Sequence, residues 1–179
     1  MRRLLALSRD IDWFNERLGY IANWFVFAAC MISAGNAVMR YTFNYSSNAW
    51  LEIQWYLFGA MFMLGASYTL KVNGHVRVDL VYGHVGPRAK LWIDVFGTIL
   101  FLLPMTIIIG WLSWSMFFSS LTSMEYSSNA GGLIRWPIKF CLPFGFLMLT
   151  AQGLSELIKR IAALRGDADL VQSYERPVQ

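Results

Sequence analysis

Apolar residues gather along the chain into four long blocks separated by short polar segments, at about residues 19–39, 50–70, 91–118 and 140–157. A helix needs about 20 such residues to cross the hydrocarbon core of a bilayer. Only a helix pairs its backbone groups within one segment there. The pattern therefore predicts an all-α integral membrane protein with four transmembrane helices. The last block is the weakest prediction, because it is the shortest and prolines mark its start.

The composition supports this prediction. Of the 179 residues, 56% are hydrophobic and 15% are charged, whereas soluble domains carry about 45–50% apolar and about 25% charged residues. The length suits a single domain. The formal net charge is +4, but the basic residues flank the apolar blocks instead of clustering with aromatic residues. No nucleic-acid partner is therefore expected.

The distribution of Lys and Arg predicts the orientation of the chain. Twelve of the 15 basic residues lie before the first block, between the second and third blocks, or after the fourth; the other three are Arg40, Arg135 and Lys139. Segments rich in Lys and Arg stay in the cytoplasm. With four crossings, both termini are then cytoplasmic, and Arg40 and Arg135 lie on the opposite side.

Residues 1–18 form an amphipathic pattern ahead of the first block. The apolar positions are spaced by three and four, at Leu4, Leu7, Ile11, Phe14 and Leu18. This spacing predicts a helix that lies in the cytoplasmic membrane interface. The alternative is that it extends the first span into water. A cleaved signal peptide is not expected, because this segment carries three acidic residues and the block after it is long.

The membrane domain is expected at residues 19–164, followed by a polar cytoplasmic tail at 165–179. Within the first span, Ala29, Ser33 and Ala37 are spaced by four, which is typical of a close helix-packing face. Pro104 lies in the middle of the third span, where a missing N–H predicts a kink.

Ionisable residues within the expected spans are few, and Glu52, in the first turn of the second span, is the main candidate. Three interpretations of Glu52 stay open: a favourable interaction with the helix dipole, a buried partner on another chain, or transport of a proton or ion. No span contains a histidine or a cysteine pair, and His75 and His84 are too far apart for a typical metal site. Neither an enzyme nor a bound cofactor or metal is expected.

The two loops on the non-cytoplasmic side share the sequence Tyr-Ser-Ser-Asn-Ala, at residues 45–49 and 126–130. A tryptophan follows each copy, at Trp50 and Trp136. A duplicated helical hairpin would produce this repeat. Shared turn and capping chemistry would explain it equally well.

Taken together, the motifs resemble those of a known family. The second span opens with Glu52 and ends near Gly74-His75-Val76-Arg77-Val78-Asp79, and the fourth begins with Trp136-Pro137 and Lys139. In this order and topology, over roughly residues 12–165, the chain resembles the small membrane subunit of tripartite ATP-independent periplasmic (TRAP) transporters.

The resemblance implies a fixed scaffold beside a large polytopic membrane subunit in the bacterial inner membrane. In this family the large subunit carries the substrate and sodium sites, and a periplasmic substrate-binding protein delivers the substrate, commonly an organic acid. The small subunit does not bind substrate itself. The alternative from the residues alone is a self-sufficient four-span homo-oligomeric transporter or channel that uses Glu52.

Several residues acquire expected roles within this framework. Asp79 is placed to pair with Arg77 or a nearby lysine and fix the cytoplasmic loop; the alternative is an ordinary solvated run of charges. Basic residues there are candidate contacts for lipid phosphates. Those candidates are Arg77, Arg88 and Lys90. Trp136 and Lys139 are expected to anchor the fourth helix at the periplasmic interface.

Overall fold

The computed structural model describes residues 1–75 and 84–166, in which the regular elements are helices and the only pairing of extended chain is an isolated bridge between Tyr126 and Ile134. The prediction of an all-helical protein is confirmed. The elements are α1 (Arg2–Phe43), α2 (Asn48–Lys71), α4 (Pro87–Gly97), the π-helix η1 (Thr98–Leu102), α5 (Leu103–Thr122) and α6 (Trp136–Leu164).

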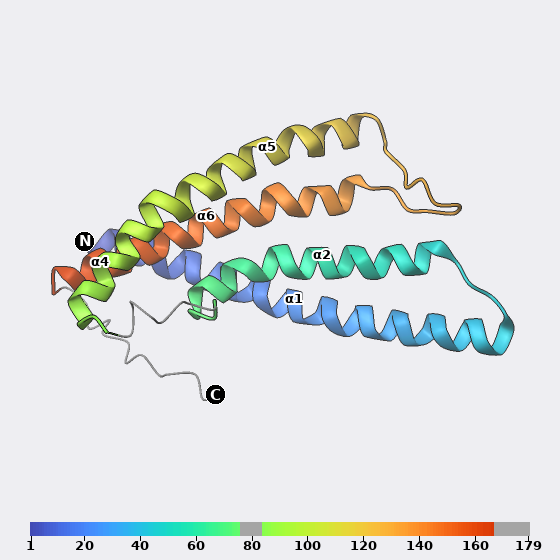
Figure 1. Cartoon of the computed structure of the whole chain (residues 1–179), viewed down its shortest axis with the longest axis horizontal. Coiled ribbons are helices and arrows are strands. Elements are labelled where there is room, and N and C mark those ends of the chain that lie inside the picture. Colours follow the sequence, from blue (N-terminus) through green and yellow to red (C-terminus); the bar gives the residue numbers. More distant parts are fainter. Residues whose placement is uncertain (76–83, 167–179) are drawn as a thin grey trace.

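The helices form two long hairpins, α1–α2 and α5–α6, that lie side by side (Figure 1). Helix α6 packs against α1, α2, α4 and α5. The connections at 44–47 and 123–135 lie at one end of the molecule, and the N-terminus and the end of α6 lie at the other (Figure 1). This arrangement agrees with a chain whose described ends share one side.

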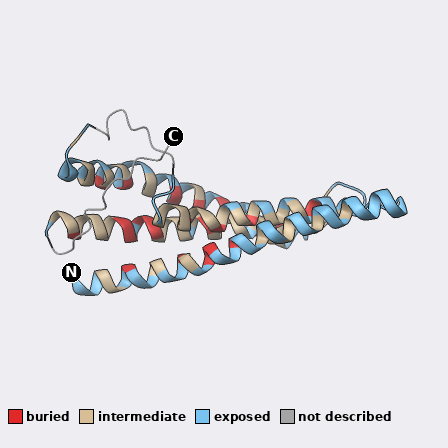
Figure 2. Cartoon of the chain, turned by 90° about the horizontal axis from the view of Figure 1, so that it is seen from below, coloured by how far each residue is buried: buried red, intermediate tan, exposed pale blue. Residues whose placement is uncertain are grey.

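Burial is inverted relative to a soluble domain. The largest fully buried side chains are mostly polar, among them Gln152, Asn15 and Thr106, whereas Phe101 is 75% and Trp111 is 78% exposed. Exposed residues dominate the surface of the long helices (Figure 2). Water would make this surface unfavourable, while lipid tails accept it and make internal polar contacts valuable. The protein is therefore a multi-pass membrane protein.

Three helices of the described part are long and apolar enough to cross a bilayer: α1, the continuous helix Pro87–Thr122, and α6. The predicted fourth span, 140–157, lies within α6. This helix has 29 residues and is therefore longer than the apolar block. Helix α2, which contains the predicted span 50–70, has 24 residues but is not among the three. The exact number of four crossings therefore stays a prediction.

Helix α1 is continuous through both the amphipathic segment and the first predicted span. Its 42 residues correspond to about 63 Å at 1.5 Å per residue, about twice the hydrocarbon thickness. Ser8 and Asn15 are buried, whereas Leu4 and Leu7 are about half exposed. Small polar residues of this segment therefore pack inward together with Leu18, while Leu4, Leu7 and the charged residues Arg9 and Arg17 face outward.

The helix from α4 to α5 is continuous, and η1 forms a π-helical turn within it. The N–H of Leu103 donates to the carbonyl of Thr98, a π-type contact that widens one turn. Pro104 follows directly at the start of α5, where its missing N–H is tolerated because the widened turn rearranges the preceding hydrogen bonds. The irregularity predicted at Pro104 is thus a π-helical turn, and the ribbon curves along this helix (Figure 1).

The predicted helix-packing face of α1 is not used within this chain. Ser33 and Ala37 are exposed and Ala29 is half-buried. Helix α1 instead buries a different side against α2, where Gly19 lies so close to Tyr68 that an added Cβ would be 2.6 Å from the ring. A packing role for Ala29, Ser33 and Ala37 therefore stays a prediction, for contact with another chain.

Candidate functional site

Glu52 ties the first turn of α2 to the loop at 123–135. It is 5% exposed. One carboxylate oxygen accepts hydrogen bonds from the Ser127 hydroxyl and, at 2.8 Å, from the Asn129 amide nitrogen. The other oxygen accepts from the backbone N–H of Leu133 at 2.7 Å. Both oxygens of this acidic side chain are therefore occupied by groups of the same chain.

The two Tyr-Ser-Ser-Asn-Ala copies meet beside Glu52. In the first copy, Ser47 caps α2 by accepting a hydrogen bond from the Ala49 N–H at 3.3 Å. Asn48 then donates to the carbonyl of Ala130, in the second copy, at 3.0 Å. The second copy caps no helix, because it lies in the loop and α6 begins only at Trp136. Both copies nevertheless share a turn contact, because the Asn129 N–H donates to the Ser127 hydroxyl at 3.4 Å as the Ala49 N–H does to Ser47. Duplication and shared turn chemistry therefore both stay predictions.

Glu125 forms a second set of contacts in the same loop. It binds Lys139 and, at 3.3 Å, Arg135. The Lys139 ammonium group, followed by other donors that include Arg135, lowers the pKa of the Glu125 carboxyl from 4.5 to about 2. Lys139, predicted as an interfacial anchor, thus fixes the loop to the start of α6. We name the Glu52 and Glu125 contacts together the loop clasp.

At the opposite end, a buried polar network joins α1 to α6. The side chain of Gln152 is fully buried; it accepts a hydrogen bond from the Asn15 amide at 2.8 Å. Its own amide nitrogen donates to Asp12 at 2.8 Å and to Glu156 at 3.1 Å. Ser155 donates to Asp12 as well, at 2.8 Å. Every donor of the Gln152 amide is therefore used.

Ion pairs extend this network to α4. Lys159 lies between Asp12, at 3.0 Å, and Glu156. Arg160 binds Glu156 at 2.7 Å and Asp94 at 2.9 Å. Buried charges of this kind need partners, since removal of one leaves the other uncompensated. Helices α1, α4 and α6 are thus held together at this end, and we name these contacts the N-terminal network.

Sequence reasoning missed both groups of contacts. The Glu52 partners lie about 80 positions away in an irregular loop, and no spacing rule connects them. A signal for the N-terminal network is present, however. Polar residues recur at helical spacing at Ser8, Asp12 and Asn15, and again at Gln152, Ser155, Glu156 and Lys159. A polar stripe on a helix next to lipid indicates a helix partner.

The remaining predicted residues at the end of α2 take ordinary structural positions. Gly74 donates its N–H to the carbonyl of Thr69 at 2.9 Å in the turn that follows α2, and His75 is the last described residue of this stretch. Arg77 and Asp79 lie outside the described residues, so their predicted pairing has no structural account.

The remaining motif residues lie at helix starts. Trp136 and Pro137 open α6, where a proline without N–H costs no hydrogen bond. Arg88 is exposed and Lys90 is half-buried at the start of α4. Among the described residues, no three of the His, Cys, Asp and Glu side chains are placed to hold a metal ion.

The family model described as "Tripartite ATP-independent periplasmic transporters, DctQ component" matches residues 29–163. The chain belongs to this family. The match covers most of the chain, including the loop clasp and the α6 side of the N-terminal network. No curated protein and no solved structure matches the chain.

Membership identifies this DctQ protein as the small component of a TRAP transporter. The family consists of transporter components and is not an enzyme family. A tripartite transporter has further components, and this membership implies them as partners. The resemblance to the small membrane subunit of TRAP transporters is therefore confirmed.

Proposed function

We propose that this DctQ protein is the fixed scaffold of a sodium-coupled TRAP transporter that imports organic acids in the bacterial inner membrane. It supports the large transport subunit and does not bind substrate. A periplasmic binding protein delivers the substrate to the assembled complex. Four crossings with cytoplasmic termini complete the proposal, with Arg88 and Lys90 near lipid phosphates.

The observation that carries this proposal is the internal pairing of the polar groups. The carboxylate of Glu52 is held by three donors of its own chain. At the opposite end, Gln152, Lys159 and Arg160 bind carboxylates of the same chain. A transport path needs polar groups that can exchange their partners for substrate or ions. These groups instead join helices, as expected of a rigid support.

The alternative, a self-sufficient channel that uses Glu52, is less well supported. A carboxylate that faces a shared cavity would present at least one oxygen to water or an ion. In this chain one oxygen of Glu52 binds Ser127 and Asn129, and the other binds Leu133. Opening such a site would require the loop clasp to come apart.

The large outward apolar surface offers room for a partner subunit. Ser33 and Ala37, which are exposed on α1, would allow close approach of another helix if that face is covered in the complex. We therefore retain this face as a proposed contact between subunits and not within the chain.

The decisive experiment is co-purification followed by reconstitution. Tagged DctQ protein is extracted in mild detergent, and the proteins it retains are identified by mass spectrometry. A large polytopic membrane protein is expected at a stoichiometric level. Liposomes with both proteins and the binding protein should show sodium-dependent uptake of an organic acid, and liposomes with DctQ alone should show none. Uptake by DctQ alone, abolished by Glu52→Gln, would favour the channel instead.

A further inference from the structure

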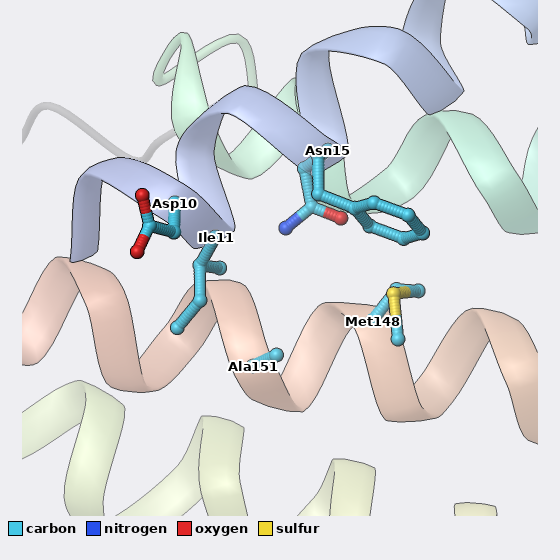
Figure 3. A pocket seen from close by; sticks show the side chains of 6 residues that line it. Asp10, Ile11, Asn15, Met148 and Ala151 are labelled. Atoms are coloured by element: carbon cyan, nitrogen blue, oxygen red, sulfur yellow. The ribbon is translucent and has the colours of Figure 1, made fainter. Parts of the chain in front are cut away.

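A pocket of about 260 Å³ opens between the N-terminal part of α1 and α6. Figure 3 shows side chains of both helices around it. Small-molecule sites usually measure about 300–1,000 Å³, so this pocket suits one or two protein side chains better than a ligand. Its lining residues are Asp10, Ile11, Phe14, Asn15, Met148 and Ala151.

One polar atom at the pocket has no partner. The side chain of Asn15, which is 1% exposed, extends from α1 toward α6 (Figure 3). Its nitrogen donates to Gln152, but its oxygen accepts no hydrogen bond. A buried amide oxygen is normally satisfied. A donor inserted into the pocket would complete the N-terminal network.

The rim of the pocket carries an unpaired charge. Asp10 is exposed, and it is the one carboxylate in residues 1–75 and 84–166 without an ion pair or hydrogen bond. By contrast, Asp12 and Glu16 on the same helix bind Lys159 and Lys71. A negative charge beside apolar walls favours a partner that combines a basic group with an apolar one.

We propose that this pocket is a docking site for the large membrane subunit. An apolar side chain of that subunit packs on Ile11, Phe14 and Met148, and a neighbouring Lys or Arg pairs with Asp10. A donor of the same segment reaches the unpaired oxygen of Asn15. This inference rests on the proposed scaffold function, and it specifies the surface of the scaffold that the partner covers.

Lipid is the less suitable occupant. The pocket adjoins the ion pairs Glu16–Lys71 and Asp12–Lys159, so it lies at the depth of the charged groups and not among acyl chains. The cytoplasmic leaflet is anionic and repels the carboxylate of Asp10. The exposed side chains of Leu4 and Leu7 suit either occupant, so Asp10 distinguishes them.

Site-specific photo-cross-linking tests the contact directly. A benzophenone amino acid replaces Phe14, which is 43% exposed, in the full complex in its membrane. The matched control is the same replacement at Phe96 on α4, which is 55% exposed. We expect an adduct with the large subunit at position 14 that exceeds the one at position 96. A lipid adduct alone at position 14 would overturn the proposal.

Variants of Asp10 test the charge. Asp10→Lys is expected to weaken binding of the large subunit roughly tenfold, mainly by slowing association and in a salt-dependent way, as for a charge at the rim of an interface. Asp10→Glu keeps the charge and should restore retention. Glu16→Gln is the matched control, because its partner Lys71 belongs to the same chain. Equal retention by all three variants would contradict the proposal.

The outcomes separate this inference from the proposed function. If the large subunit co-purifies but neither cross-links at position 14 nor responds to Asp10→Lys, only the docking site is wrong. If no large subunit co-purifies with the unaltered chain, the scaffold function fails first.

Discussion

At the scale of single residues, acidic side chains hold the helices and loops together at the two ends of this protein. Glu52 and Glu125 hold the loop at 123–135 on α2 and α6. Asp12 and Glu156 hold the other end through Lys159. Hydrogen bonds to charged groups are roughly twice as strong as neutral ones. A small number of carboxylates can therefore fix long helices that have no hydrophobic effect to hold them together in lipid.

Glu52→Gln should loosen the loop clasp. The amide keeps one acceptor oxygen but places an NH₂ group against the N–H of Leu133 or the amide of Asn129. We expect the loop to be cleaved about tenfold faster by protease, the effect of losing about one charged hydrogen bond. Gln54→Ala is the control, since Gln54 bonds only to the carbonyl of Trp50 in its own helix. Equal cleavage of both variants would contradict the structural role.

The Glu125 contacts should weaken in acid. The folded pKa is about 2, against 4.5 for the free group, so the unfolded state binds more protons between these values. The contribution is therefore complete above about pH 4.5 and is lost as the pH falls toward 2. Thermal unfolding of the wild type and Glu125→Gln is compared from pH 7 to 3. Their difference in Tm should shrink below pH 4.5; a constant difference would refute the assignment.

At the scale of elements, α6 is the central helix because the other helices approach it closely. Gly145 makes one such approach: an added Cβ would lie 2.8 Å from the carbonyl oxygen and 2.9 Å from the Cβ of Met63 on α2. Small residues permit this proximity, and van der Waals contact and hydrogen bonds then hold the helices. Larger residues would force the two hairpins apart.

Gly145→Ala is expected to destabilise the packing of α2 on α6 by about 1–3 kcal/mol, the usual effect of overpacking. Gly35→Ala in α1 is the matched control, because an added Cβ there meets nothing within 4 Å. The free energy of unfolding is measured by detergent-induced unfolding of the two variants. Similar stability of both variants would mean that α2 and α6 do not approach as described.

At the scale of the whole molecule, the surface is apolar and the interior is partly polar. Exposed side chains such as Trp55, at 73%, and Phe101, at 75%, cover the long helices, while Gln152 and Ser155 are fully buried. The loops at 44–47 and 123–135 lie together at the end away from the N-terminus (Figure 1). These two loops and the N-terminus therefore lie at opposite ends of the described chain.

Cysteine labelling tests the proposed topology, and in particular whether α2 crosses the membrane. Single cysteines replace Ser46, Ala130 and Gly86 in a chain without Cys30 and Cys141. An impermeant thiol reagent applied from the periplasm should label positions 46 and 130, and should label position 86 only after lysis. Labelling of position 86 in intact membranes would contradict the four crossings.

Much of the fold was predictable because the controlling interactions are local. Pro104 indicated an irregular third helix, and the structure shows a π-helical turn just before it. Trp136 and Pro137 marked the start of α6, although the helix is longer than its apolar block. The weakest predicted span proved one of the three long apolar helices, since Pro143 lies within α6 without ending it.

The predicted contacts were less accurate because they depend on distant segments. The spacing of Ala29, Ser33 and Ala37 indicated a packing face, yet α1 buries another side. The partner of Glu52 was sought in the helix dipole or another chain, and it lies in a loop of the same chain. Small-residue spacing shows that helices can approach, but it does not say which neighbour is present.

The sequence by itself determined the membrane environment, the helical class and the family, because hydrophobic block length and motif order are written along the chain. Only the tertiary structure decided which polar groups meet. Asn15 and Gln152 are separated by 137 positions, and Asp12 and Lys159 by 147. Their contact depends on how α1 crosses α6, a geometry that local periodicity does not encode.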